Sequence, residues 1–181
     1  MMLSDDKIIK QTINWIKSVV IDCNFCPFAA KVILKNSIHY IVKSETTIND
    51  VLETLKKELI RLENDSETET SFIIFSNDFK NFDEYLDLVK KAERFITKEN
   101  YDGIFQIASF HPDYCFEGSD ENDPANYTNR SIYPMLHILR EESLTKALSL
   151  YPDPEKIPEH NIAFARQKGL QYMQLLRAAC L

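Results

Sequence analysis

The sequence predicts an α/β fold in which three strands alternate with helices. Three short segments with the composition of strands lie near residues 37–43, 71–76 and 104–110. Amphipathic helical stripes fill the intervals, an alternation typical of βαβ units with parallel strands. A chain of 181 residues can bury a proper core, so we expect a single domain over residues 1–181. A two-layer α+β, ferredoxin-like arrangement is the alternative.

Two helical segments are expected before the first strand. Ser4, followed by two aspartates, can cap a helix whose apolar face runs from Ile8 to Val20. Pro27 can open a short helical turn that ends near Leu34, because the missing N–H of proline costs nothing at the first helical position.

The helices between the three strands have clear start signals. Thr47 and Asp50 resemble a capping box ahead of an apolar stripe that ends at Leu62. Asn81 with Glu84 can cap the helix that leads to the third strand.

Two more helices are expected after the third strand, which makes five or more in all. Ser131 and Pro134 mark the start of one helix, which continues through Leu136 and Leu139. The apolar positions of the final helix are Ile162, Leu170, Met173 and Leu176.

The connection from Phe110 to Glu141 is the most informative stretch of the chain. Pro112, Gly118 and Pro124 break both helical and strand periodicity. A structureless connection of roughly twenty residues is uncommon in a compact domain and usually marks a binding loop or lid. Its aromatic residues argue against disorder. In a parallel sheet this loop begins at the carboxyl edge, where ligands bind in open α/β sheets. We therefore expect a functional site here.

The composition excludes several classes of partner. The formal net charge of −7 argues against a nucleic-acid partner, which requires a cationic face. No apolar stretch approaches the roughly 20 residues of a membrane span, and no polybasic run suggests a lipid surface. With only three glycines, the chain has no P-loop or dinucleotide-binding turn. Four cysteines without an evident export signal favour reduced thiols, so we expect a cytoplasmic protein.

Two histidines are candidates for acid/base catalysis. His111 directly follows the third predicted strand, and His137 lies near the start of a predicted helix with Arg140 on the same face. An imidazole titrates near neutral pH and can act as general acid, general base or metal ligand. The alternative for each is a structural histidine bonded to the backbone. We predict acid/base chemistry or a divalent-metal site at His111 and His137.

Arg130 is the candidate anion-binding residue. Its guanidinium group offers a planar fork for a carboxylate or phosphate, and a helix N-terminus is expected beside it. A salt bridge to Asp120, Glu121 or Asp123 is an equally good interpretation. Asn126 also suits a turn around the nearby proline. The predicted contacts to a small anionic ligand are Arg130, Asn129, Asn126, Tyr114 and Arg140.

Cys26 stands before a proline, where the N–H groups of the predicted short helix favour the thiolate. Such a thiolate would be a nucleophile, or a third metal ligand beside His111 and His137. An alternative is a tetrahedral zinc site with the four ligands Cys23, Cys26, His111 and Cys115. A dithiol redox pair of Cys23 and Cys26 is a further alternative, although the upstream segment is a predicted helix rather than the strand of a thioredoxin-like fold. Buried, inert thiols are the simplest interpretation.

Several motifs are long enough to be specific as a set. They include Asn24-Phe25-Cys26-Pro27-Phe28-Ala29, Phe110-His111-Pro112-Asp113-Tyr114 and Asp123-Pro124-Ala125-Asn126-Tyr127-Thr128-Asn129-Arg130-Ser131. Through them nearly the whole chain resembles a bacterial family known only as a domain of unknown function, number 1415 in that series. The resemblance places Cys26, His111 and His137 at motif positions, and it implies no particular activity. Cys23 and Cys115 depart from the family's pattern, which weakens the zinc and dithiol interpretations.

The leading hypothesis is a small cytoplasmic enzyme or ligand-binding domain with one anion-accepting pocket beside residues 110–140. Arg130 would hold the anion there. Cys26 and the two histidines would share the pocket as acid/base groups, nucleophile or metal ligands. The competing hypothesis is a non-catalytic interaction or structural module. Reaction, substrate and oligomeric state do not follow from the sequence.

Overall fold

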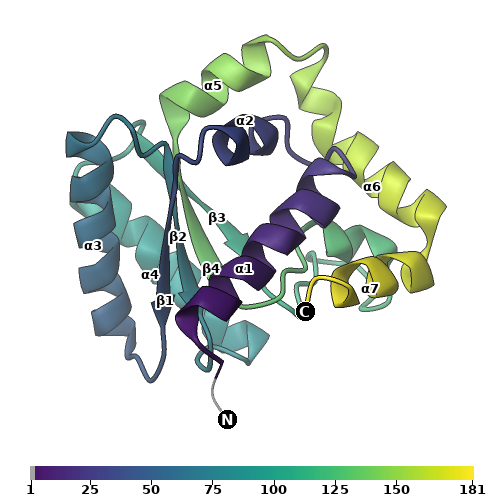
Figure 1. The fold of residues 1–181 in the computed structure, drawn as a ribbon, viewed down its shortest axis with the longest axis horizontal. Helices are drawn as coiled ribbons and strands as arrows, with labels where there is room; N and C mark the ends of the chain where they lie inside the picture. The colour runs from purple at the N-terminus through teal and green to yellow at the C-terminus, as the bar shows by residue number, and fades with distance from the viewer. Residues whose placement is uncertain (1–2) are drawn as a thin grey trace.

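The structure, a computed structural model that describes residues 3–181, has a four-stranded sheet with helices on both faces (Figure 1). The strands β1 (Ile38–Lys43), β2 (Thr70–Phe75), β3 (Phe105–Phe110) and β4 (Met135–Arg140) lie in the order β1-β2-β4-β3. β1 and β2 are parallel, whereas β4 is antiparallel to both β2 and β3. The predicted α/β fold and its three strands are confirmed. A fourth strand separates the second from the third.

The segment that forms β4 was expected to be a helix, and that prediction is wrong. The helix does not begin near Ser131; instead β4 runs first, and the helix α5 (Glu141–Ser149) follows it. Residues 135–139 are all buried, because the central strand is covered on both faces. Such a strand has a continuous apolar sequence, which periodicity alone does not distinguish from a buried helix.

Two of the helices cover one face of the sheet, and the others cover the opposite face or extend beyond it (Figure 1). Their bounds are α1 (Asp5–Trp15), the π-helical turn η1 (Ile16–Ile21), α2 (Ala29–Leu34), α3 (Ile48–Asn64), α4 (Phe82–Lys98), the 3-10 turn η2 (Pro124–Thr128), α5, the 3-10 turn η3 (Pro154–Lys156), α6 (Ile157–Lys168) and α7 (Leu170–Ala178).

Three of the predicted helix starts are confirmed by their caps. The Ser4 hydroxyl accepts from the Lys7 N–H at 3.4 Å and caps α1. Thr47 and Asp50 form a reciprocal capping box at the start of α3. The Asn81 side chain accepts from two backbone N–H groups at the start of α4. These caps could be predicted from the sequence because each depends only on residues within one turn of the helix start.

The predicted final helix is divided into α6 and α7. Gly169 separates them with φ of +82° and ψ of 161°, a backbone conformation that ends α6 and turns the chain into α7. Only glycine adopts this region without strain, so the break is specified by the residue type.

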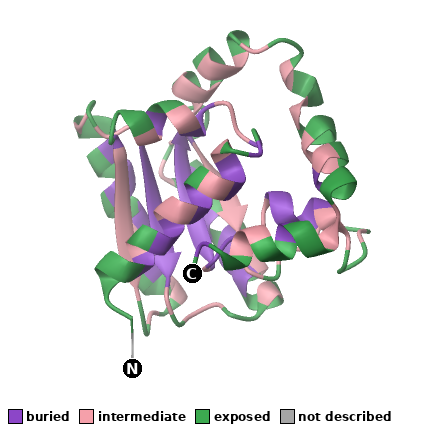
Figure 2. Ribbon diagram, turned by 45° about the vertical axis from the view of Figure 1, so that its right-hand side comes forward, coloured by how far each residue is buried: buried purple, intermediate pink, exposed green. Residues whose placement is uncertain are grey.

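The core is divided by the sheet into two apolar layers. Side chains of Phe72, Ile74 and Met135 pack against α1 and η1, whereas Ile73, Leu136 and their neighbours pack against α3 and α4. This is the alternation that a pleated strand imposes. Figure 2 shows the buried central strands β2 and β4 inside, while α5 and α6 form a largely exposed arm that leaves the end of β4.

Candidate functional site

The predicted binding loop is ordered by hydrogen bonds within itself. Asn126 is fully buried; its Oδ1 accepts from the Phe116 N–H at 3.1 Å, and its Nδ2 donates to the Asp120 carbonyl at 2.9 Å. The Arg130 guanidinium donates to the carbonyl oxygens of Tyr114 and Glu121, each at 2.9 Å. These two side chains close the loop, which explains how a long irregular segment stays packed.

The other predicted ligand contacts also have partners in the protein. Asn129 donates to the Ser109 carbonyl at 3.2 Å, and Tyr114 packs its ring 5.3 Å from that of Phe82. Arg140 donates to carbonyl groups at the end of α3 and beyond it, including that of Thr68 at 2.9 Å. The contacts show structural roles. Ligand binding at these residues stays a prediction.

His111 is held in one neutral form by the backbone. Its Nε2 donates to the Phe79 carbonyl at 2.9 Å, and its Nδ1 accepts from the Asp113 N–H at 3.0 Å. Burial lowers the pKa of His111, although the bond to Phe79 acts in the opposite direction. The ring lies 5.0 Å from Tyr85, on the α4 side of the sheet. Both nitrogens are therefore engaged.

His137 lies on the opposite face of the sheet. Its ring stacks on Phe72 at 3.9 Å between centroids, and Nε2 lies 2.7 Å from the Thr70 hydroxyl. That hydroxyl donates its single hydrogen to the Ile138 carbonyl, so Nε2 must be the donor to Thr70. Nδ1 is then an unprotonated acceptor with no partner in the described chain. Burial lowers the pKa of His137 to about 3, so the ring is neutral at physiological pH.

Cys26 and His137 are brought together, whereas His111 is not. Both of the former line a small apolar cavity of about 50 Å³ behind Phe28 and Val32. Burial raises the pKa of the Cys26 thiol, and the N–H groups of Phe28 and Ala29 only partly oppose this. This direction favours the protonated thiol over the expected thiolate, and the role of Cys26 as a nucleophile stays a prediction.

The predicted metal sites are not formed. Across residues 3–181, no three side chains of His, Cys, Asp or Glu come close enough to hold one ion. The shared site of Cys26, His111 and His137 fails because the sheet separates the two histidines. The alternative zinc site of Cys23, Cys26, His111 and Cys115 is not formed either: the Cys23 thiol lies 4.0 Å from the Ser18 carbonyl, and the Cys115 thiol lies 3.5 Å from the Ser119 carbonyl.

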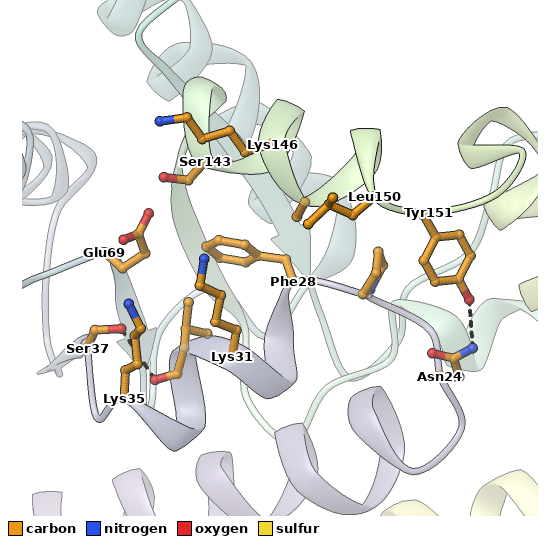
Figure 3. A pocket seen from close by; sticks show the side chains of 13 residues that line it. Asn24, Phe28, Lys31, Lys35, Ser37, Glu69, Ser143, Lys146, Leu150 and Tyr151 are labelled. Atoms are coloured by element: carbon orange, nitrogen blue, oxygen red, sulfur yellow. Dashed lines mark hydrogen bonds between the residues drawn. The ribbon is translucent and has the colours of Figure 1, made fainter.

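A larger pocket, of about 480 Å³, lies between α2 and α5 (Figure 3). Ser37 and Glu69, which precede β1 and β2, form part of its wall, together with Ser143 of α5. It therefore lies at the amino edge of the parallel strands, opposite to the edge that the sequence indicated. A smaller hollow of about 230 Å³ touches the 110–140 segment at Tyr127 and Ile132, and none of the predicted site residues lines it.

Three lysines line the larger pocket, which we call the α2–α5 pocket. Lys31 and Lys35 are one turn apart on α2 and its C-cap, and neither ammonium group has a hydrogen-bond or ion-pair partner within the described residues. Lys146 of α5 pairs with Glu142 at 2.5 Å on the surface. In Figure 3 the two unpartnered ammonium groups lie at the same end of the pocket as the Glu69 carboxylate.

Glu69 gives this charged end a negative group as well. One of its carboxylate oxygens is buried and has no donor among residues 3–181. The Glu69 backbone is fixed, because its N–H donates to the Ser37 carbonyl at 2.8 Å. Glu69 also helps to raise the pKa of Lys146, after the larger effects of Glu142.

The rest of the pocket is apolar and ends in a neutral polar pair. Phe28 and Leu150 lie in its middle, and Val32 and Phe28 also separate it from the Cys26 cavity. At the far end the Asn24 amide donates to the Tyr151 hydroxyl at 2.8 Å. The pocket thus offers an ionic end and an apolar middle to one small molecule.

The fold and this site define a mixed α/β domain with a charged pocket between two helices. The model of the family described as "Protein of unknown function (DUF1415)" matches residues 7–175, so the chain belongs to this family. Neither the curated proteins nor the solved structures contain a match. None of the helices within residues 3–181 is long and apolar enough to cross a membrane.

Proposed function

We propose that this protein binds a small organic anion in the pocket between α2 and α5, as an enzyme or as a ligand-binding domain. The observation that carries the proposal is the pair of unpartnered ammonium groups of Lys31 and Lys35 on one concave surface. The chain as a whole has a net charge of −7, so a local excess of positive charge at this surface is the opposite of what the overall composition would give. An anion bound there would reduce the repulsion between neighbouring lysines.

The volume and the lining support a molecule of moderate size. About 480 Å³ falls within the range of roughly 300–1,000 Å³ that is usual for ligand pockets. Phe28 and Leu150 would cover its apolar part, and Leu150 is 87% exposed without a ligand partner. All four cysteines are free, which supports the expected cytoplasmic location.

A catalytic version is favoured by one observation. Cys26 and His137, whose Nδ1 is unprotonated, line the cavity that Phe28 separates from the pocket. A thiol reaction there would require a bound substrate to displace Phe28 and to stabilise the thiolate. Protection of Cys26 from alkylation by a bound anion would support this version, and equal alkylation with and without the anion would argue against it.

Anion binding can be tested with 1-anilinonaphthalene-8-sulfonate, an organic anion with an apolar body, followed by fluorescence. The double variant Lys31→Gln with Lys35→Gln should bind the probe about tenfold more weakly, which corresponds to about 1.4 kcal/mol. The matched control is Lys57→Gln with Lys91→Gln, two exposed lysines of α3 and α4 on the opposite face. Equal affinities of the two double variants would contradict the proposal.

A further inference from the structure

We infer that the ligand of the α2–α5 pocket is a zwitterion, an α-amino acid with an apolar side chain or a molecule with the same arrangement of charges. This inference rests on the proposed function and adds a second requirement to it. Besides its anionic group, the ligand must carry a cationic hydrogen-bond donor close by. The residue that imposes this requirement is Glu69.

One oxygen of the Glu69 carboxylate has no hydrogen-bond donor among the pocket residues. This oxygen is shielded from solvent and receives no hydrogen bond from residues 3–181. A buried acceptor without a donor is unfavourable, so a rotation of the Glu69 carboxylate that brings this oxygen to a donor on a bound molecule adds to the affinity. An ammonium group is the donor that also matches the charge of a carboxylate.

The lysines around Glu69 do not neutralise it. Lys146 is already paired with Glu142 at 2.5 Å, and neither Lys31 nor Lys35 forms an ion pair with Glu69. The pocket therefore keeps groups of both signs separate at one end (Figure 3). A ligand with a single negative charge would satisfy the lysines and be repelled by Glu69. A ligand whose ammonium and carboxylate groups are on one carbon can satisfy both.

The apolar middle of the pocket determines the rest of the ligand. Phe28 and Val32 line it from α2 and its N-cap, and Leu150 lines it from the end of α5. An apolar side chain that extends from the charged end would lie between these residues and remove them from water. The Asn24–Tyr151 pair limits this region at the far end.

Three probes of the same shape separate the charges: L-phenylalanine, 3-phenylpropanoate without the ammonium group, and 2-phenylethylamine without the carboxylate. Isothermal titration calorimetry should show phenylalanine binding at least about tenfold more tightly than either analogue. Glu69→Gln should remove the advantage of phenylalanine over 3-phenylpropanoate and leave 3-phenylpropanoate no weaker. The control Glu159→Gln, at an exposed carboxylate of α6 that does not line the pocket, should preserve that advantage.

Each failure has a distinct result. If 3-phenylpropanoate binds as tightly as phenylalanine, the inference of a zwitterionic ligand is wrong, while the proposed anion-binding function stands. If Glu69→Gln strengthens both ligands equally, Glu69 acts only through its charge on the lysines, and the inference is again wrong. If the naphthalene sulfonate binds in a lysine-dependent manner and none of the three probes binds, the amino-acid class is wrong. If the lysine variants also leave the sulfonate unaffected, both proposals are wrong.

Discussion

Burial of His137 makes the stability of the fold sensitive to acid. The ring faces the apolar cavity behind α2, and burial lowers its pKa from 6.5 to about 3. Between these two pKa values, His137 therefore binds a proton in the unfolded chain but not in the folded protein. The contribution to stability is complete above pH 6.5 and is lost as the pH falls toward 3. Each pH unit in this window corresponds to about 1.4 kcal/mol, so roughly 2–3 kcal/mol should be lost by about pH 4.5.

Urea unfolding at about pH 7 and about pH 4.5 measures this loss. Carboxylates titrate in the same window, so the informative quantity is the difference between the native protein and His137→Gln. The stability advantage of the native protein should shrink by roughly 2–3 kcal/mol at the lower pH. His160→Gln, at an exposed position of α6, is the control and should follow the native protein. Equal losses for the native protein and His137→Gln would refute the claim that the folded ring excludes a proton.

Three further predictions concern other parts of the fold. Asn126→Ala removes a fully buried side chain, the acceptor of the half-buried Phe116 N–H and one of the donors to the Asp120 carbonyl, so urea unfolding should show a loss of about 2 kcal/mol; a loss below about 0.5 kcal/mol would contradict the role of Asn126 in closing the loop. Thr47→Ala removes the capping box of α3 and should lower the unfolding free energy by about 1 kcal/mol, with no change expected in the denaturant dependence. The alkylation rate of Cys26 should still be rising above pH 9.0, because burial raises the thiol pKa; a plateau near neutral pH would instead indicate an activated thiolate.

The parts of the fold that depend on local chemistry could be predicted from the sequence. Helix caps at Ser4, Thr47 and Asn81 were correct, because each depends on side chains within one turn of the backbone they bind. The fourth strand was missed because its apolar run is buried on both faces and has no helical or strand period. The order β1-β2-β4-β3 follows from that strand, so it was not predictable without it.

The candidate site was harder to predict than the fold. The polar residues of the 110–140 segment were conspicuous in the sequence, yet Asn126 and Arg130 bond to the loop's own backbone. Lys31 and Lys35 have the spacing of an ordinary solvated helix face, and Lys146 is distant in sequence. Only the placement of α5 over α2 makes one pocket of them. Such long-range neighbours leave no local pattern.

The position of β4 has a consequence for the order in which the protein can be made. Among the described residues β3 pairs only with β4, and β4 also joins it to β2. A nascent chain on the ribosome can therefore form the β1–β2 pair early, but β3 has no strand to join until residue 140 has emerged. Until then the edges of β2 and β3 that β4 later covers are open to other chains. Translation that stalls between β3 and β4 would therefore yield the species most prone to aggregate.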